Sequence, residues 1–277
     1  MKEELAKKWE KGADFYNRNF YSFNKKQWEH LVAPYLNDEP GIKSILDVGT
    51  GPGQLALLLA SMGHEVTGLD LSKRMIELAN QHNEEARHKA TFLEGNAEYM
   101  HFLDNSFHLI TNRLNLWTLP NPGLFVQQAY RVLKTNGKIL LFITMPDSKK
   151  VYENPQTNKK EEIFTEDYQK AVAQLPFRNA SPAQVKALLD AAGFKETVGY
   201  EFNDERTFTA EHMADMLSDY GEAGEAFQQL LKNHPSKDEV ESFLQKYHFS
   251  HGEVHYNSEG ALSFVFPIDS AMITGRK

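Results

Sequence analysis

An apolar run that ends in three closely spaced glycines constrains this chain more than any other feature. Residues 45–48, Ile-Leu-Asp-Val, run directly into Gly49-Thr50-Gly51-Pro52-Gly53, and an apolar segment with helical character, residues 55–62, follows. Glycines in such a turn allow a tight reversal and let a ligand approach the backbone, where the first amides of a helix have no partner within the helix. The pattern predicts a strand, a turn and a helix that together hold a nucleotide-like cofactor.

Short apolar runs alternate with helical patterns from residue 44 to residue 144, which is typical of βαβ units and a parallel sheet. Residues 181–203 form another unit, and residues 208–247 show helical spacing without strand signals. We therefore expect an α/β fold, Rossmann-like and doubly wound, with a mostly parallel seven-stranded sheet, helices on both faces and a helical insertion before the last strand. The expected strands are residues 44–48, 65–69, 91–94, 109–112, 137–144, 197–202 and 261–275.

Composition excludes several classes of function. The formal net charge of -8 disfavours a nucleic-acid partner, so a small-molecule substrate is favoured. No apolar run approaches the length that crosses a bilayer, and the charged first residues lack the apolar core of a secretion signal. We expect no membrane partner and a cytoplasmic location.

A metal site is not expected. The chain has no cysteine, which excludes disulfides, thiolate nucleophiles and cysteine metal ligands. His248, His251 and His255 are close in sequence, but Gly252 interrupts any helix through them and no acidic partner is fixed. We interpret them as exposed loop histidines.

Two carboxylates accompany the glycine turn, and one of them, Asp47, together with Gln54 favours a cationic cofactor over a dinucleotide. Asp47 precedes the turn, where it would repel a pyrophosphate but attract the ammonium group and the positive sulfur of S-adenosylmethionine. Gln54 stands where a dinucleotide fingerprint has its last glycine. Asp70 ends the next expected strand, where it can accept hydrogen bonds from ribose hydroxyls in either kind of cofactor.

On these residues the chain resembles the class I, seven-stranded S-adenosylmethionine-dependent methyltransferases, specifically the small-molecule branch that includes the ubiquinone and menaquinone biosynthesis type. The segment LDVGTGPGQ, residues 46–54, carries the most specific part of the resemblance, which covers residues 35–145 well and residues 181–203 and the last strand more loosely. It implies a methyltransferase with S-adenosylmethionine as cofactor and a small-molecule acceptor.

The resemblance also implies a set of cofactor-binding residues. Asn96 stands where the family has an acid that binds the adenine amino group, and its side-chain carbonyl can still accept that bond without charge assistance. Asn112 ends the fourth expected strand, at the edge where open α/β sheets bind ligands. The expected set is Asp47, Gly49, Thr50, Gly51 and Gly53 around the methionine part, Asp70 at the ribose, Leu71, Met75, Asn96 and Ala97 at the adenine, and Asn112.

Four residues are candidates for contact with the acceptor. Arg113 clamps an acidic acceptor, holds the cofactor carboxylate or pairs with a neighbouring acid, and its position leaves these three roles open. Trp117 follows in the same loop, and Tyr16 and Tyr21 belong to an aromatic N-terminal segment that is either a lid or core. Methyl transfer needs a base only for some acceptors. His30, Tyr16 and Tyr21 are then candidates, and no residue is assigned a catalytic role.

The domain organisation follows from the same resemblance. We expect a single domain, residues 1–277, in which residues 1–34 form a helical lid and residues 35–145 bind the cofactor. Residues 146–180 and 204–258 are insertions expected to shape the acceptor pocket. Two alternative functions stay open: an NAD(P)-dependent oxidoreductase, and a non-catalytic S-adenosylmethionine-binding protein.

Overall fold

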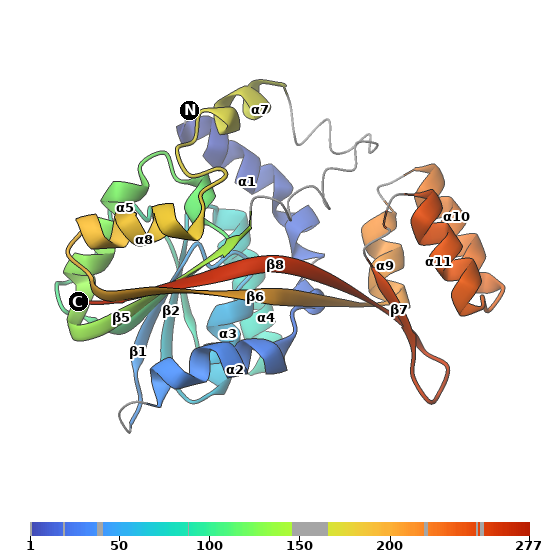
Figure 1. The fold of residues 1–277 in the computed structure, drawn as a ribbon, viewed down its shortest axis with the longest axis horizontal. Coiled ribbons are helices and arrows are strands. Elements are labelled where there is room, and N and C mark those ends of the chain that lie inside the picture. The colour runs from blue at the N-terminus through green and yellow to red at the C-terminus, as the bar shows by residue number, and fades with distance from the viewer. Residues whose placement is uncertain are drawn as a thin grey trace.

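One sheet of eight strands organises the described part of the chain (Figure 1). The strands lie in the order β3-β2-β1-β4-β5-β8-β6, and β7 pairs with β8 outside this row. The five strands from β3 to β5 run parallel, whereas β8 runs antiparallel to both β5 and β6. The expected α/β fold with a mostly parallel sheet is confirmed.

The computed structural model describes residues 2–18, 20–37, 41–87, 89–145, 166–218, 221–247, 249 and 252–277. The strands are β1 (Ser44–Val48), β2 (Glu65–Asp70), β3 (Thr91–Glu94), β4 (Phe107–Arg113), β5 (Leu133–Thr144), β6 (Lys195–Thr209), β7 (Glu253–Tyr256) and β8 (Leu262–Arg276). The helices are α1 (Lys2–Asn17), α2 (Lys25–Leu36), α3 (Gln54–Ser61), α4 (Lys73–Ala86), α5 (Pro122–Val132), α7 (Glu166–Ala173), α8 (Pro182–Ala191), α9 (Ala210–Leu217), α10 (Glu222–Lys232) and α11 (Lys237–Lys246), with short 3-10 turns η1 (Phe20–Ser22) and η2 (Leu116–Thr118).

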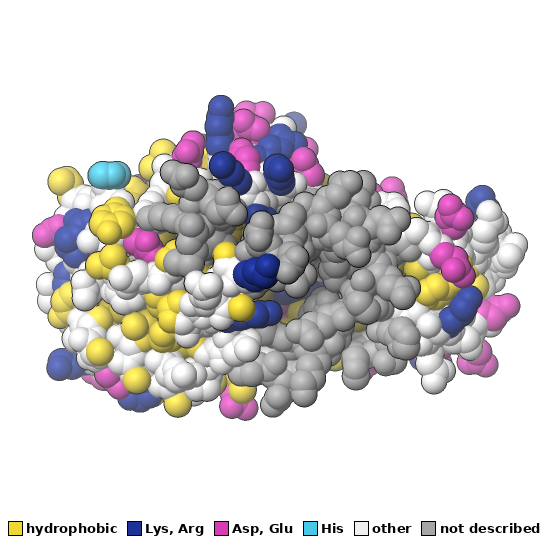
Figure 2. Space-filling view, turned by 90° about the horizontal axis from the view of Figure 1, so that it is seen from above, with side chains coloured by type: hydrophobic (Ala, Val, Ile, Leu, Met, Phe, Trp, Pro, Cys, Tyr) yellow, Lys and Arg dark blue, Asp and Glu magenta, His cyan; other side chains and the backbone are white. Residues whose placement is uncertain are grey.

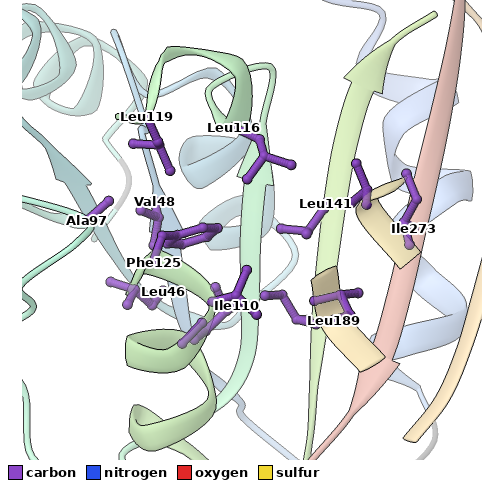
Figure 3. Close-up of a cluster of buried hydrophobic side chains, with 14 of the residues drawn as sticks. Leu46, Val48, Ala97, Ile110, Leu116, Leu119, Phe125, Leu141, Leu189 and Ile273 are labelled. Atoms are coloured by element: carbon purple, nitrogen blue, oxygen red, sulfur yellow. The ribbon is translucent and has the colours of Figure 1, made fainter. Parts of the chain in front are cut away.

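Helices cover both faces of the sheet, because the central strands are apolar on both sides. On one face α5 and α8 bury Phe125 and Leu189 against Leu46, Ile110 and Leu141 of the sheet (Figure 3). On the other face α2, α3 and α4 pack against the alternate strand residues. Alternating side chains of one strand therefore belong to two separate hydrophobic layers.

The strands at one side of the sheet are longer than the sequence predicted. β6 continues to Thr209 instead of ending at residue 202, and β7 was not expected. Residues 204–209 were assigned to an insertion, and that boundary is wrong, because these residues pair antiparallel with β8 from Ile268 to Ser263. Their polar sequence hid a strand that is mostly exposed.

The long β6 and β8 strands carry a second helical layer away from the main sheet (Figure 1). α9, α10 and α11 follow β6 and pack with β7 and the outer part of β8 around Phe227 and Phe264. The helical insertion expected before the last strand is confirmed. The outer helices thus have a hydrophobic core of their own.

The N-terminal helices pack on the main layer. α2 buries Trp28 against Phe142 of β5, with ring centroids 4.7 Å apart. α1 contacts α4 and α7. Residues 146–165, the first part of the insertion expected at residues 146–180, lie outside the described residues.

Two surface properties complete the description. Acidic and basic side chains lie mixed on the described part of the face that Figure 2 shows. Among the described residues, no helix combines the length and the apolar character that a bilayer span requires.

Candidate functional site

The glycine turn after β1 leaves room for a ligand. Gly49, Gly51 and Gly53 have φ values of 68°, 54° and 92°, a backbone region that other residues rarely adopt. α3 begins directly after Gly53, its N-cap. A Cβ atom added to Gly51 would meet no atom within 4 Å. One side of the turn is therefore open beside the first turn of α3.

Asp47 lies beneath this turn and is 2% exposed. Its two oxygens accept hydrogen bonds from the hydroxyls of Thr50, at 2.7 Å, and Thr111, at 2.6 Å. Burial raises the pKa of Asp47 to about 6, and these hydrogen bonds and the charge of Arg113 oppose the shift. A positive charge bound at the turn would lower this pKa and favour the ionised carboxylate.

Asp70, at the end of β2, joins the turn to α4. Its carboxylate accepts hydrogen bonds from the amide of Gly51, at 2.8 Å, and from the amide of Ser72, at 3.0 Å. Burial raises the pKa of Asp70, and backbone hydrogen bonds oppose this. The two acids expected at the cofactor therefore lie on either side of the same glycine turn.

The residues expected at the adenine lie in different surroundings. Leu71 is partly exposed next to Asp70, whereas Met75 is buried against Ala13 of α1. Ala97 is buried in the core. The side-chain carbonyl of Asn96, expected to accept the adenine amino group, accepts a hydrogen bond from the amide of Glu98 at 3.0 Å.

Asn112 closes the site on the β4 side. It is fully buried, and its amide nitrogen donates to the carbonyl of Val48 at 2.9 Å and to the side chain of Asn115 at 3.3 Å. Its side-chain oxygen is buried without a hydrogen-bond partner. Leu114, two residues later, has a φ of 57°. A strained residue and an unsatisfied acceptor thus lie beside the glycine turn, as is common at ligand sites.

Two of the four acceptor candidates come together. Tyr16 and Trp117 both contact Trp9 of α1. The ring centroid of Trp9 lies 4.9 Å from that of Tyr16 and 6.0 Å from that of Trp117. Tyr21 lies elsewhere, 55% exposed and stacked on His212 of α9 at 4.9 Å. This aromatic group therefore includes Trp9, a residue of the aromatic N-terminal segment that was not among the four candidates.

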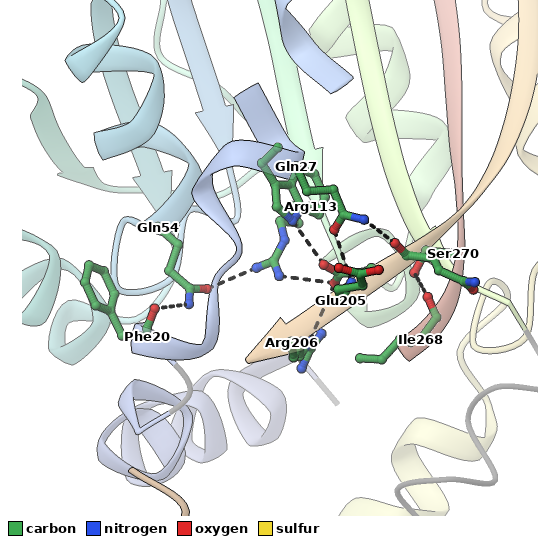
Figure 4. A network of polar contacts seen from close by, with 11 residues as sticks. Phe20, Gln27, Gln54, Arg113, Glu205, Arg206, Ile268 and Ser270 are labelled. Atoms are coloured by element: carbon green, nitrogen blue, oxygen red, sulfur yellow. Dashed lines mark hydrogen bonds and ion pairs between the residues drawn. The ribbon is translucent and has the colours of Figure 1, made fainter. Parts of the chain in front are cut away.

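Arg113, the fourth candidate, lies in a network of side chains from β4, α2, α3 and β6 (Figure 4). It donates to Gln54 at 3.0 Å and pairs with Asp204 at 3.5 Å. Its guanidinium also contacts the rings of Phe23 and Trp28, 5.0 Å and 4.8 Å from their centroids. Of the three roles open to Arg113, pairing with a neighbouring acid is present in the structure.

The histidine predictions have mixed outcomes. His30, a candidate base, is exposed on α2, so the structure gives it no place at the turn. His255 is exposed but lies in β7 and not in a loop, with Glu253 at 3.3 Å. His248 and His251 lie outside the described residues. The described residues contain no group of acidic and histidine side chains that could hold a metal ion.

Sequence reasoning missed several residues of the site. The side chain of Asn115 lies where a Cβ on Gly49 would be, so it packs directly on the turn. Glu10 of α1 accepts hydrogen bonds from the hydroxyl of Ser72, at 2.7 Å, and the amide of Arg74, at 3.1 Å. One signal for Asn115 was present in the sequence. Two asparagines, Asn112 and Asn115, lie close together at the end of an apolar strand, where polar side chains indicate a site.

Comparison with known proteins adds an independent finding. Residues 46–141 match the family model described as a methyltransferase domain. A ubiquinone/menaquinone biosynthesis C-methyltransferase of Bradyrhizobium sp. is 29% identical over 189 residues, which cover 60% of this chain and 72% of the relative. A ubiquinone biosynthesis O-methyltransferase of Coxiella burnetii is 31% identical over 157 residues, which cover 54% of this chain and 65% of the relative.

The fold is also found in solved structures. A phosphoethanolamine N-methyltransferase of Haemonchus contortus, solved with S-adenosyl-L-methionine, superposes with a TM-score of 0.55 and 18% identity. The superposition covers 91% of this chain and 52% of the other. This similarity shows the fold, and the match of residues 46–141 to a methyltransferase domain does not favour an NAD(P)-dependent oxidoreductase.

Proposed function

We propose that the chain is an S-adenosylmethionine-dependent enzyme that methylates a small molecule, because residues 46–141 match the model of a methyltransferase domain. The relatives are named as a C-methyltransferase of ubiquinone and menaquinone biosynthesis and an O-methyltransferase of ubiquinone biosynthesis, and a structural neighbour was solved with this cofactor. The observation that carries the proposal is the open glycine turn with an acid on either side, the buried Asp47 and the half-buried Asp70.

The described residues fit a cationic nucleoside. Gly51 provides open space, Asp47 supplies a negative charge beneath the turn, and Asp70 retains lone pairs for ribose hydroxyls. The unsatisfied oxygen of Asn112 is an acceptor suited to the cofactor's ammonium group. The proposed contact set also keeps Gly49, Thr50, Gly53, Leu71, Met75, Asn96 and Ala97.

When bound, S-adenosylmethionine supplies an electrophilic methyl group on a positively charged sulfur. The chain's own residues hold the donor and the acceptor in line and exclude water, which accounts for much of the acceleration in a displacement of this kind. Tyr16, Trp117 and Trp9 form an apolar wall on the side of α1. We propose that α1 and η1 form the lid and that the insertions shape the acceptor pocket within a single domain.

Calorimetry tests this function. S-adenosylmethionine and S-adenosylhomocysteine are expected to bind the purified chain, and Asp70→Asn is expected to weaken both about tenfold, because it removes a charged hydrogen-bond acceptor. Asp104→Asn is the matched control, since Asp104 is exposed and pairs with Arg131 of α5. Absence of binding, or binding of NADH instead, would overturn the proposal.

Turnover separates the enzyme from a protein that only binds the cofactor. Formation of S-adenosylhomocysteine would be followed with phenols, amines, thiols and carboxylates as acceptors. One methylated product supports the enzyme, whereas tight binding without any product supports the non-catalytic alternative. A cytoplasmic location and the lack of a nucleic-acid partner stay predictions from the sequence.

A further inference from the structure

We propose that Arg113 anchors a carboxylate of the methyl acceptor. This inference rests on the proposed methyltransferase function and adds the chemical class of the acceptor. It starts from the position of Arg113 at the carboxyl end of β4, directly after Asn112. Ligands of open α/β sheets bind at this edge.

The guanidinium of Arg113 is held in one orientation and still has donors to offer. Gln54 and Asp204 each take one of its terminal nitrogens, at 3.0 Å and 3.5 Å. The Nε atom is buried with no hydrogen-bond partner. Because contact with the rings of Phe23 and Trp28 fixes the plane, a bidentate bond to a carboxylate costs little further ordering.

The charges around Arg113 favour an added anion. The oxygen of Asp204 that pairs with Arg113 lies 3.5 Å from the Nε of Arg206 as well, so two guanidiniums share one carboxylate oxygen. The other oxygen accepts the indole N–H of Trp28 at 3.0 Å. Burial lowers the pKa of Arg113 to about 10; the charges of Asp204 and Asp47 oppose this shift, and the charge of Arg206 adds to it. A second carboxylate would relieve this repulsion.

The same surroundings favour a single negative charge over a phosphate dianion. Asp204 is 2% exposed and Asp47 is equally buried, so two acids already lie within range of Arg113. Both acids repel an added anion, and they repel a dianion about twice as strongly as a single carboxylate, which the two guanidiniums can offset. Gln54, the first residue of α3, connects Arg113 to the helix that begins at the cofactor turn. The anchored carboxylate would therefore lie next to the methyl donor, S-adenosylmethionine.

Probe binding to protein saturated with S-adenosylhomocysteine tests the inference. Dissociation constants of benzoate, of its neutral isostere benzamide and of phenyl phosphate would be measured by ligand-observed NMR titration. We expect benzoate to bind about 30-fold more tightly than benzamide, as for a hydrogen-bonded charge pair. Arg113→Met is expected to reduce this ratio to about one, and Arg113→Lys to an intermediate value.

Arg276→Met is the matched control, because Arg276 lies at the far end of β8, pairs with Glu196 and is partly exposed. It should keep the wild-type ratio. The inference is overturned if the wild type binds benzoate and benzamide with equal affinity, or binds neither measurably. Tighter binding of phenyl phosphate than of benzoate overturns the choice of a carboxylate. If Arg113→Met does not fold, the inference is decided by the ratio of benzamide to benzoate dissociation constants in the wild type and in Arg113→Lys. Failure of S-adenosylhomocysteine to bind overturns the proposed function instead.

Discussion

Alanine substitutions of three glycines with positive φ separate the cost of backbone strain from the loss of ligand space. Gly51→Ala places a methyl group at a φ of 54° with no atom within 4 Å, so the only cost in the unliganded protein is left-handed strain of about 1 kcal/mol. For a chain of this size that lowers the melting temperature by about 2 to 4 °C. The methyl group fills the space proposed for the cofactor, so affinity for S-adenosylhomocysteine should fall at least about tenfold.

Gly63→Ala is the matched control for Gly51→Ala, and Gly49→Ala shows the effect of adding a steric clash. Gly63 has a φ of 92° and equally open surroundings but lies at the end of α3, so Gly63→Ala should cost similar stability and leave cofactor affinity unchanged. Gly49→Ala collides with the side chain of Asn115 and should cost a further 1 to 3 kcal/mol, roughly, as overpacking does. Asn115→Gly in the same chain should recover most of this additional loss, because the Cβ of Asn115 is itself one of the colliding atoms.

Chemical denaturation and calorimetry on the same samples give both quantities. The reasoning fails if Gly51→Ala binds S-adenosylhomocysteine as tightly as the wild type. It also fails if Gly51→Ala is destabilised as strongly as Gly49→Ala, because the open space beside Gly51 would then not exist.

Three further predictions follow from buried or bridging polar groups. Asp47 has a pKa of about 6 in the folded state, above its ordinary value, so the folded state holds the proton more tightly and the free energy of unfolding falls as pH rises from about 4 through 6. Asp47→Asn should remove this fall when urea unfolding is measured at several pH values. The same dependence on pH in the variant and the wild type would contradict this prediction. Trp28→Phe removes the indole donor to buried Asp204 and should cost about 1 to 3 kcal/mol in the same assay, whereas a neutral effect would show that Asp204 does not need this bond. Glu10→Gln weakens the contact of α1 with the N-terminus of α4, so the rate of amide hydrogen exchange in α1 should rise about fivefold. Glu77→Gln, a change within α4, should leave this rate unaltered. Equal exchange rates in the two variants would argue against the bridge from Glu10 to α4.

The local parts of the fold could be predicted from the sequence. Residues 181–203 were expected to form another helix-and-strand unit, and α8 begins at its start with a reciprocal cap between Ser181 and Gln184. β1 and β3 have the predicted bounds. These features depend on neighbouring residues, so a pattern along the chain is enough to find them.

The parts that depend on distant partners could not be predicted. The polar run Asn203-Asp204-Glu205-Arg206 reads as a loop, yet β8 supplies its hydrogen bonds and makes it a strand. β5 begins four residues before its predicted start, at Leu133, and includes Asn136 with a φ of 63°. Asparagine tolerates this conformation better than most residues, so Asn136 fits a backbone position that otherwise favours glycine.

The same limit applies to the candidate site. Asp47 and Asp70 were found because they end strands that flank the glycine turn. Trp9 and Asp204 belong to segments far from the turn in sequence, and only the folding of α1 and β6 over it reveals them. Whether the remaining predicted contacts bind the cofactor is decided by the titrations described above.

The ribbon of β6 and β8 takes part in two hydrophobic cores at once. Its inner half completes the main sheet, and its outer half supports Phe264 beneath α10 and α11. Asp204, which holds Arg113, lies six residues before the start of α9 on the same strand. The outer helices are therefore not a removable appendage: deleting them would leave the strand that carries Asp204 without its second support, and the acceptor side of the molecule would lose its order with them.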